Sequence, residues 1–201
     1  MTDSITNKNK LIQLLRSTNR EGIELVIQNL EELGFFEAPA SSNHHLSIPG
    51  GLVLHSLNVC ELSLKIKTQL LVFKPEIDSQ IKDESIIITS LLHDVCKAEI
   101  YKPAIKKRKM QSGFWQEYQG YEVDYSRFPM GHGEKSVIRL LQWGLKMSED
   151  EMLAIRWHMA TWDIPFQSYE SKENINKATE KCPLLKLIQA ADGLAASILE
   201  K

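Results

Sequence analysis

The chain has 201 residues, of which 43% are hydrophobic and 25% are charged, the balance of an ordinary globular protein. This length allows one domain with a sizeable core and is short for two domains. The formal net charge of −2 gives no overall basic field that would attract nucleic acid or an anionic membrane. An anionic substrate therefore has to be attracted locally, by a metal ion or by a few cationic side chains.

The three cysteines, Cys60, Cys96 and Cys182, are far apart in the sequence and form no CxxC pair. This spacing argues against a disulfide framework and against a cysteine-type zinc site. The N-terminal residues are polar and lack the apolar stretch of a signal peptide. No apolar run approaches the ~20 residues that span a bilayer. We therefore expect a cytoplasmic protein without a membrane partner.

Hydrophobic periodicity predicts helices in the first half of the chain. Apolar residues recur at helical spacing over 23–33, Gly34 follows as a stop signal, and a shorter helix is expected around 11–15. The segment 37–51 is rich in Pro, Ser and His and is expected to form an ordered loop. Its last two residues are glycines, which are expected to open the next helix.

That third helix is predicted to run from the paired glycines to about Val72 and to end before Pro75. Another helix is predicted over 83–97. Its Ile86-Ile87-Ile88 run could be mistaken for a strand, but the segment is long, begins with two acidic residues and contains no turn signal. We therefore favour a helix at this position.

Between about residues 99 and 129 the pattern changes. Aromatic residues cluster there, and Gln111-Ser112-Gly113 has the composition of a turn, so a small inserted β-hairpin is predicted. The basic run Lys106–Lys109 near this turn is interpreted as a solvated surface, with phosphate steering as the alternative. Trp115, Tyr118 and Tyr121 could stack on a nucleic-acid base. They could equally pack the hairpin against the helices.

Helical signals resume near Gly133 and continue to the end of the chain. Ser148 and Glu151 have the spacing of a capping box, which predicts a helix that starts at this point. Pro183 suits the first turn of a last helix that reaches Leu199. Together these patterns predict one mainly α-helical domain.

Two polar residues interrupt apolar helix faces. His55 lies on an apolar face of the third predicted helix, and Asp192 lies on an apolar face of the last one. A buried carboxylate must be paired, hydrogen-bonded or bound to a metal ion. From the residues alone, His55 could be a satisfied core histidine, and Asp192 could form a salt bridge or cap a helix.

The adjacent pair His93-Asp94 interrupts a third apolar segment with two possible ligands. Imidazole and carboxylate together form a normal ligand set for Mn, Fe, Co, Ni or Zn. Lys97 is expected one turn beyond His93 on the same helix face, where its ammonium could approach a phosphate oxygen. The alternative for Lys97 is a solvated helix C-terminus, which cations also favour.

Five short segments then occur in a characteristic order: GGLVLHS (50–56), LLHDVCK (91–97), GHGEKS (131–136), RWHM (156–159) and AADGLAAS (190–197). In this order they resemble the H…HD…H…H…D signature of HD-domain metal-dependent phosphohydrolases. The Asn43-His44-His45 loop is similar to one in the HD domain of bacterial 3′–5′ exoribonucleases. The resemblance implies a single HD domain over 1–201, with lead-in helices at 1–42, a core at 43–198 and the hairpin inserted at about 99–129.

The resemblance also implies the roles of the site residues. The principal divalent ion, which could be Mn, Fe, Co, Ni, Zn or Mg, would be bound by His55, His93, Asp94 and Asp192. His132 and His158 correspond to histidines that bind a second ion or face the substrate phosphate in relatives. From the residues alone, His132 is a loop residue near a helix start, and His158 lies on the flank of a helix. Because Met159 stands where two-metal relatives often have a second histidine, we expect one tightly held ion.

The expected function is metal-assisted hydrolysis of a phosphoester, with a nucleotide or another small phosphorylated metabolite as substrate. Asp94 and Lys97 are assigned catalytic roles, and His45 is a candidate substrate contact or a loop-stabilising residue. Nucleic acid is not favoured as a partner, because exoribonuclease relatives carry a separate OB-type domain for which this chain has no room. Two alternatives are an HD-fold di-iron oxygenase, marked by a mixed-valence iron pair, and a non-catalytic nucleotide-sensing module.

Overall fold

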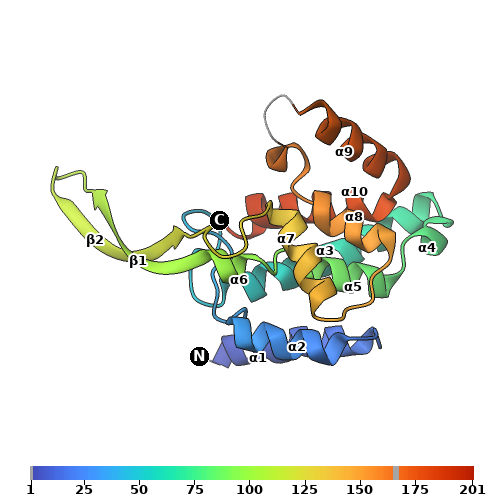
Figure 1. Cartoon of the computed structure of the whole chain (residues 1–201), viewed down its shortest axis with the longest axis horizontal. Helices are drawn as coiled ribbons and strands as arrows, with labels where there is room; N and C mark the ends of the chain where they lie inside the picture. The colour runs from blue at the N-terminus through green and yellow to red at the C-terminus, as the bar shows by residue number, and fades with distance from the viewer. Residues whose placement is uncertain (1, 165–167) are drawn as a thin grey trace.

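The computed structural model describes residues 2–164 and 168–201, and most of them are helical (Figure 1). The long helix α3 (Gly51–Phe73) lies at the centre and contacts helices from both halves of the chain. The other helices of the first half are α1 (Thr2–Ser17), α2 (Ile23–Leu33), α4 (Ile77–Gln80), α5 (Asp83–Leu92) and α6 (Lys97–Ile100). Those of the second half are α7 (His132–Gln142), α8 (Glu149–Trp157), η1 (Ala160–Asp163), α9 (Tyr169–Lys181), α10 (Pro183–Leu194) and η2 (Ala195–Leu199). The predicted mainly α-helical fold is confirmed.

Glycines set the ends of the early helices. Gly34 ends α2 with a left-handed φ of 75°, and Gly50 precedes α3 with the same φ, as their positions in the sequence predict. Gly22 precedes α2 at φ 88°, and a Cβ added there would lie 2.0 Å from the carbonyl oxygen of Gly144. A larger residue at position 22 would therefore separate α2 from the loop that precedes α8.

The helix predicted over 83–97 is interrupted, so that prediction was wrong at its end. Helix α5 ends at Leu92, and the backbone then makes tighter i→i−3 hydrogen bonds, such as Lys97 N–H to Asp94 O at 2.9 Å. The backbone N–H of Cys96 donates instead to the side-chain oxygen of Ser136 on α7, at 3.3 Å. This tertiary hydrogen bond replaces a helical one, which sequence periodicity does not reveal.

The inserted hairpin is confirmed and consists of β1 (Tyr101–Lys109) and β2 (Trp115–Val123), paired antiparallel from Tyr101↔Val123 to Lys109↔Trp115. Gly113 provides the turn with a φ of 84°. The hairpin projects away from the helices (Figure 1), and Trp115 is 68% exposed. The interpretation that its aromatic residues pack the hairpin onto the helices is therefore wrong for the outer half.

The second half of the chain follows most of its sequence signals. Helix α7 begins at His132, the Ser148–Glu151 capping box opens α8, and Pro183 occupies the first turn of α10. Helices α4 and α9 were not predicted, and α1 is longer than the expected segment around 11–15. Among the described helices, no single one is long and apolar enough to cross a membrane. Helix α9 and the segment Pro183–Leu199 meet these limits only as a pair bent by 104°.

A buried ion pair joins the N-terminal helices to α8. The Arg20 guanidinium binds the fully buried Glu151 carboxylate through two contacts of 2.6 and 2.8 Å. Ser85 Oγ on α5 donates to the same carboxylate at 2.7 Å, and the backbone N–H of Ser148 donates at 2.9 Å. Glu151 therefore connects the Arg20 loop, α5 and the first turn of α8.

This connection predicts that Glu151→Ala strongly destabilises the protein. Removing one partner of a buried ion pair leaves the other charge uncompensated, so we expect a loss of about 3–5 kcal/mol in the free energy of unfolding. Glu24→Ala is the matched control, because Glu24 pairs with Arg16 through two similar contacts that are exposed to solvent. Urea denaturation of both variants measures the difference. Equal destabilisation by the two substitutions would contradict the prediction.

Candidate metal centre

The structure brings together six of the residues that the sequence singles out. They are His55 on α3, His93 and Asp94 in the turn after α5, His132 at the start of α7, His158 directly after α8, and Asp192 on α10. They come from five parts of the chain and are separated by up to 137 positions in the sequence. The site therefore exists only in the folded chain.

The ligand atoms of four of these residues lie at distances suitable for a common ion. His55 Nε2 lies 3.3 Å from His93 Nε2, 3.5 Å from Asp94 Oδ2 and 3.2 Å from Asp192 Oδ1. His93 Nε2 lies 3.2 Å from Asp94 Oδ2. Bonds of about 2.0–2.2 Å to one metal ion place its ligands roughly 3 Å apart. The four residues named for the principal ion could therefore hold it with small adjustments.

Hydrogen bonds outside the cluster orient two of the histidines toward its interior. The Nδ1–H of His93 donates to the carbonyl oxygen of Ser90 at 2.9 Å, and that of His158 donates to Ile155 at 2.7 Å. In the neutral ring this leaves a lone pair on each Nε2, pointing inward. The Nε2 of His158 is buried, makes no hydrogen bond among the described residues and lies 3.3 Å from Asp94 Oδ1. A cation would satisfy this atom, so the residues present fit a metal ion.

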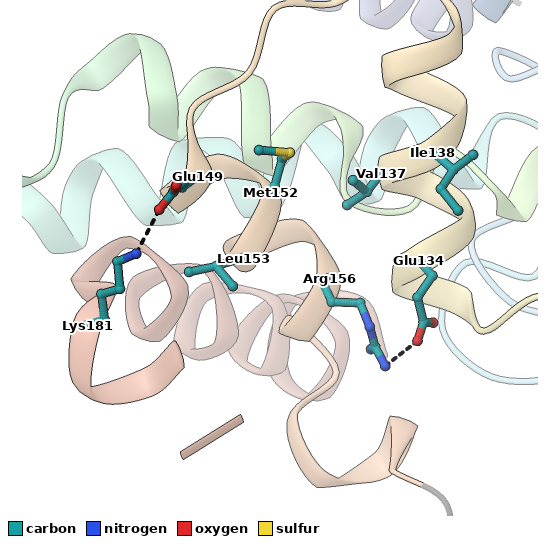
Figure 2. A pocket seen from close by; sticks show the side chains of 8 residues that line it. All are labelled: Glu134, Val137, Ile138, Glu149, Met152, Leu153, Arg156 and Lys181. Carbon is teal, nitrogen blue, oxygen red and sulfur yellow. Dashed lines mark hydrogen bonds and ion pairs between the residues drawn. The ribbon is translucent and has the colours of Figure 1, made fainter. Parts of the chain in front are cut away.

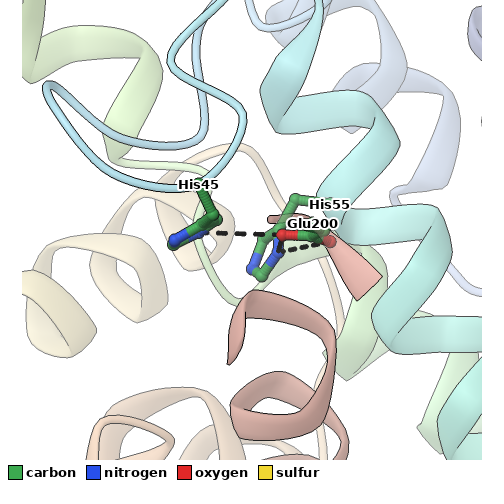
Figure 3. A group of neighbouring side chains, drawn as sticks. All are labelled: His45, His55 and Glu200. Atoms are coloured by element: carbon green, nitrogen blue, oxygen red, sulfur yellow. Dashed lines mark hydrogen bonds and ion pairs between the residues drawn. The ribbon is translucent and has the colours of Figure 1, made fainter. Parts of the chain in front are cut away.

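Glu200 completes the surroundings of His55 and was missed in the sequence. Its carboxylate accepts a hydrogen bond from His55 Nδ1 at 3.0 Å (Figure 3). It accepts another from Asn58 Nδ2 at 2.9 Å. The π-helical turn η2, in which the Glu200 N–H bonds to Ala195 O five residues back, precedes it. Regular helical periodicity does not predict this turn, and a glutamate at the end of a helix ordinarily suggests a solvated residue.

His132 has the opposite hydrogen-bond arrangement. Its Nε2 lies 2.5 Å from Asp94 Oδ1, and its Nδ1 lies 3.3 Å from Cys96 Sγ. A nitrogen–oxygen contact this short requires a proton between the two atoms, so Nε2–H donates to Asp94. The Cys96 thiol, whose pKa burial raises to about 12, stays protonated and can donate to Nδ1. His132 also forms, with Asp94 and His158, a second group of possible metal ligands.

The charges of the cluster compensate one another in the buried site. Burial disfavours an ionised Asp94, but Lys97, His93 and His132 outweigh it and hold the Asp94 pKa well below its usual range. Burial likewise opposes a charge on Lys97, whose Nζ lies 2.6 Å from Asp94 Oδ2, and the Asp94 carboxylate raises the Lys97 pKa. Burial also lowers the pKa of His55, but Asp192 and Glu200 outweigh burial and raise it to about 9.

A cavity of about 300 Å³ opens beside the cluster. Its lining includes His45, Lys97, His158, Trp162 and Asp192. Lys97 thus reaches the cavity although helix α5 ends at Leu92 and does not continue to Lys97. His45 also lines the cavity, where it could contact a substrate. Burial and the neighbouring His55 lower the pKa of His45 to about 4, so this ring is neutral at physiological pH.

A second cavity of about 360 Å³ lies between α7 and α8 and is mainly apolar (Figure 2). Ion pairs border it, Glu134 with Arg156 at 2.5 Å and Glu149 with Lys181 at 2.7 Å. None of the six clustered residues lines it. It offers no comparable set of inward-facing ligand atoms, so the cavity beside the cluster is the candidate for chemistry.

Comparison with protein families gives one match. The family TraI_2, described as "Putative helicase", matches residues 14–130, more than half of the chain. The chain belongs to this family. The segment that matches the TraI_2 family contains His55, His93 and Asp94 and ends before His132, His158 and Asp192. No curated protein and no solved structure matches the chain.

The convergence of ligand atoms predicts that His93→Ala or Asp94→Ala will abolish the binding of a divalent ion. Each substitution removes a donor that contacts His55 in the cluster. His44→Ala is the control, because His44 is exposed in the neighbouring loop. Elemental analysis after dialysis against Mn²⁺, Co²⁺ or Zn²⁺ measures the stoichiometry, for which we expect one ion per wild-type chain. Stoichiometric metal in both variants would contradict the assignment.

Proposed function

We propose that the chain is a divalent-metal-dependent phosphohydrolase of the HD type. The observation that carries this proposal is the convergence of His55, His93, Asp94 and Asp192. Backbone carbonyls also accept hydrogen bonds from the Nδ1 atoms of His93 and His158. The order of these residues along the chain is that of the H…HD…H…H…D signature. A divalent ion bound there would supply a Lewis acid and bring the pKa of water from ~15.7 toward ~7.

The chain's own residues would bind the phosphate and manage its charge. Lys97 is held ionised beside Asp94 and lines the cavity, where its ammonium can attract a phosphate oxygen. The Nε2–H of His132 donates to Asp94 and can instead be shared with a substrate oxygen that approaches this carboxylate. His158 lines the same cavity. Lys97 and His132 would thus place a cation and a hydrogen-bond donor beside one phosphoryl group.

The cavity favours a small substrate. Its volume of about 300 Å³ is at the lower end of the range for small-molecule sites. Trp162 lies in the cavity lining and is 88% exposed, so its ring is available to a planar base. A nucleotide or a similar phosphorylated metabolite therefore remains the proposed substrate class.

Loss of Lys97 should lower the rate of phosphoester hydrolysis much more than it lowers the affinity for the metal ion. Its amine is protonated and cannot act as a ligand, so Lys97→Ala should retain the ion, whose own charge would compensate Asp94 in the metal-loaded protein, and should lower kcat by ~10²–10³-fold. Lys97→Arg should recover only part of the rate, because a planar guanidinium does not replace a compact ammonium. Steady-state kinetics on metal-loaded protein with a panel of nucleotides and phosphoesters measures this effect. Lys186→Ala on the exposed side of α10 is the control, and wild-type turnover in Lys97→Ala would reject the role.

A second candidate function is nucleic-acid binding by the β1–β2 hairpin, favoured by its composition and exposure. Residues 101–125 contain five basic and three acidic residues, although the whole chain has a net charge of −2. Phe114 and Trp115 at its tip are 77% and 68% exposed, and Lys109 lies opposite Trp115. Exposed aromatic rings beside basic residues suit stacked bases and phosphates. The family's description as a helicase is consistent with such a partner.

Binding through the hairpin would be weakened by Trp115→Ala, since loss of a stacked aromatic costs about 1–3 kcal/mol per base. Fluorescence anisotropy with a labelled oligothymidylate at fixed salt measures the affinity. Tyr169→Ala is the control, because Tyr169 is 76% exposed but lies on α9, outside the hairpin. No measurable binding by the wild-type chain, or equal affinities of the two variants, would exclude this function for the hairpin.

A further inference from the structure

The C-terminal segment contacts both nitrogen atoms of His55. Asp192 on α10 lies 3.2 Å from Nε2, and Glu200 lies 3.0 Å from Nδ1. The two acidic residues are separated by the π-helical turn η2. A π turn places fewer degrees of rotation between successive residues than an α-helix, so it changes which face the following residue occupies. One continuous segment therefore holds the imidazole from two sides.

The Glu200 carboxylate hydrogen-bonds to α3, and the residue also lines a cavity of about 420 Å³ beside His44 and His45. The residue is 8% exposed, and its Oε1 accepts from Asn58 Nδ2 at 2.9 Å while both oxygens lie within 3.2 Å of His55 Nδ1. The other nearby histidine, His45, lies 3.9 Å away through its Nε2, beyond hydrogen-bonding distance (Figure 3). Asn58 and His55 both come from α3, one turn apart, so Glu200 bridges two positions of the same helix.

We propose that Glu200 is a positioning residue for the metal centre. By accepting the Nδ1 proton it leaves Nε2 as the atom that would give up its proton and bind the ion. It also holds the ring plane toward His93 and Asp192. This inference rests on the proposed metal centre, in which His55 is a ligand. Residues that accept a hydrogen bond from a metal-binding histidine typically raise the affinity for the metal by about 10–100-fold.

The test uses Co²⁺ as the probe, because its visible absorption reports the ligand geometry as well as its binding. The dissociation constant is measured by competition with a chromophoric chelator for wild type, Glu200→Ala, Glu200→Gln and Asn58→Ala. Glu61→Ala is the matched control, since Glu61 lies on α3 in an exposed position and pairs with Lys65. Circular dichroism and thermal unfolding establish that each variant is folded.

We expect Glu200→Ala to raise the Co²⁺ dissociation constant 10–100-fold and to change the visible spectrum, whereas Glu61→Ala leaves both unchanged. Glu200→Gln keeps an oxygen that can accept from Nδ1 and should recover part of the affinity. Asn58→Ala should give a smaller loss, because it loosens Glu200 without removing it. Wild-type affinity and spectrum in Glu200→Ala would overturn the positioning role while leaving the metal centre intact. Failure of the wild-type chain to bind Co²⁺ would overturn both.

Discussion

The buried carboxylate of Asp94 is the group on which the arrangement of the site depends. It is 1% exposed, and a carboxylate in such surroundings is stable only if cations or hydrogen-bond donors compensate its charge. Lys97 and His132 provide this compensation through close contacts. Since Lys97 follows the turn after α5 and His132 lies at the start of α7, the requirement fixes how these two parts of the chain meet.

The same requirement explains why the site combines two kinds of histidine. His93 and His158 are anchored by backbone carbonyls of their own turns, so their inward atoms carry lone pairs. His132 is anchored by the Cys96 thiol and presents a hydrogen. A cation and an anionic substrate need opposite partners, lone pairs for the first and hydrogens for the second. Both are present within one cluster, which supports the proposal that phosphate chemistry takes place there.

Much of this could be predicted from the sequence, for physical reasons that can be named. His55 and Asp192 interrupt apolar helix faces, and helical periodicity places such residues correctly when the helix is regular. Glycine and proline signals gave the right starts of α3 and α10. Periodicity failed where a tertiary contact replaced a helical hydrogen bond, as at Cys96, whose N–H is taken by Ser136. It also failed at Glu200, because a π turn shifts the register.

The hairpin shows a different limit of sequence interpretation. Clustered aromatic residues and a turn at Gln111-Ser112-Gly113 predicted two strands, but the pattern did not show whether helices cover them. In the structure, Lys106 contacts Ser42 and Asn43. The outer parts of β1 and β2 extend beyond the helices (Figure 1). Whether a strand face is covered depends on the distance from the body of the protein to each residue. That distance is a property of the whole fold rather than of a local sequence window.

The wide separation of the clustered residues along the chain also has a consequence for folding. His55 and Asp192 belong to α3 and α10, so their contact closes a loop that contains most of the chain. Such long loops form late, because their closure entropy must be overcome before the contact stabilises anything. An ion held at this junction would act as a removable cross-link between the first and last parts of the molecule. Its greatest effect would then be on the rate at which α10 separates from α3, and so on how long the folded chain persists.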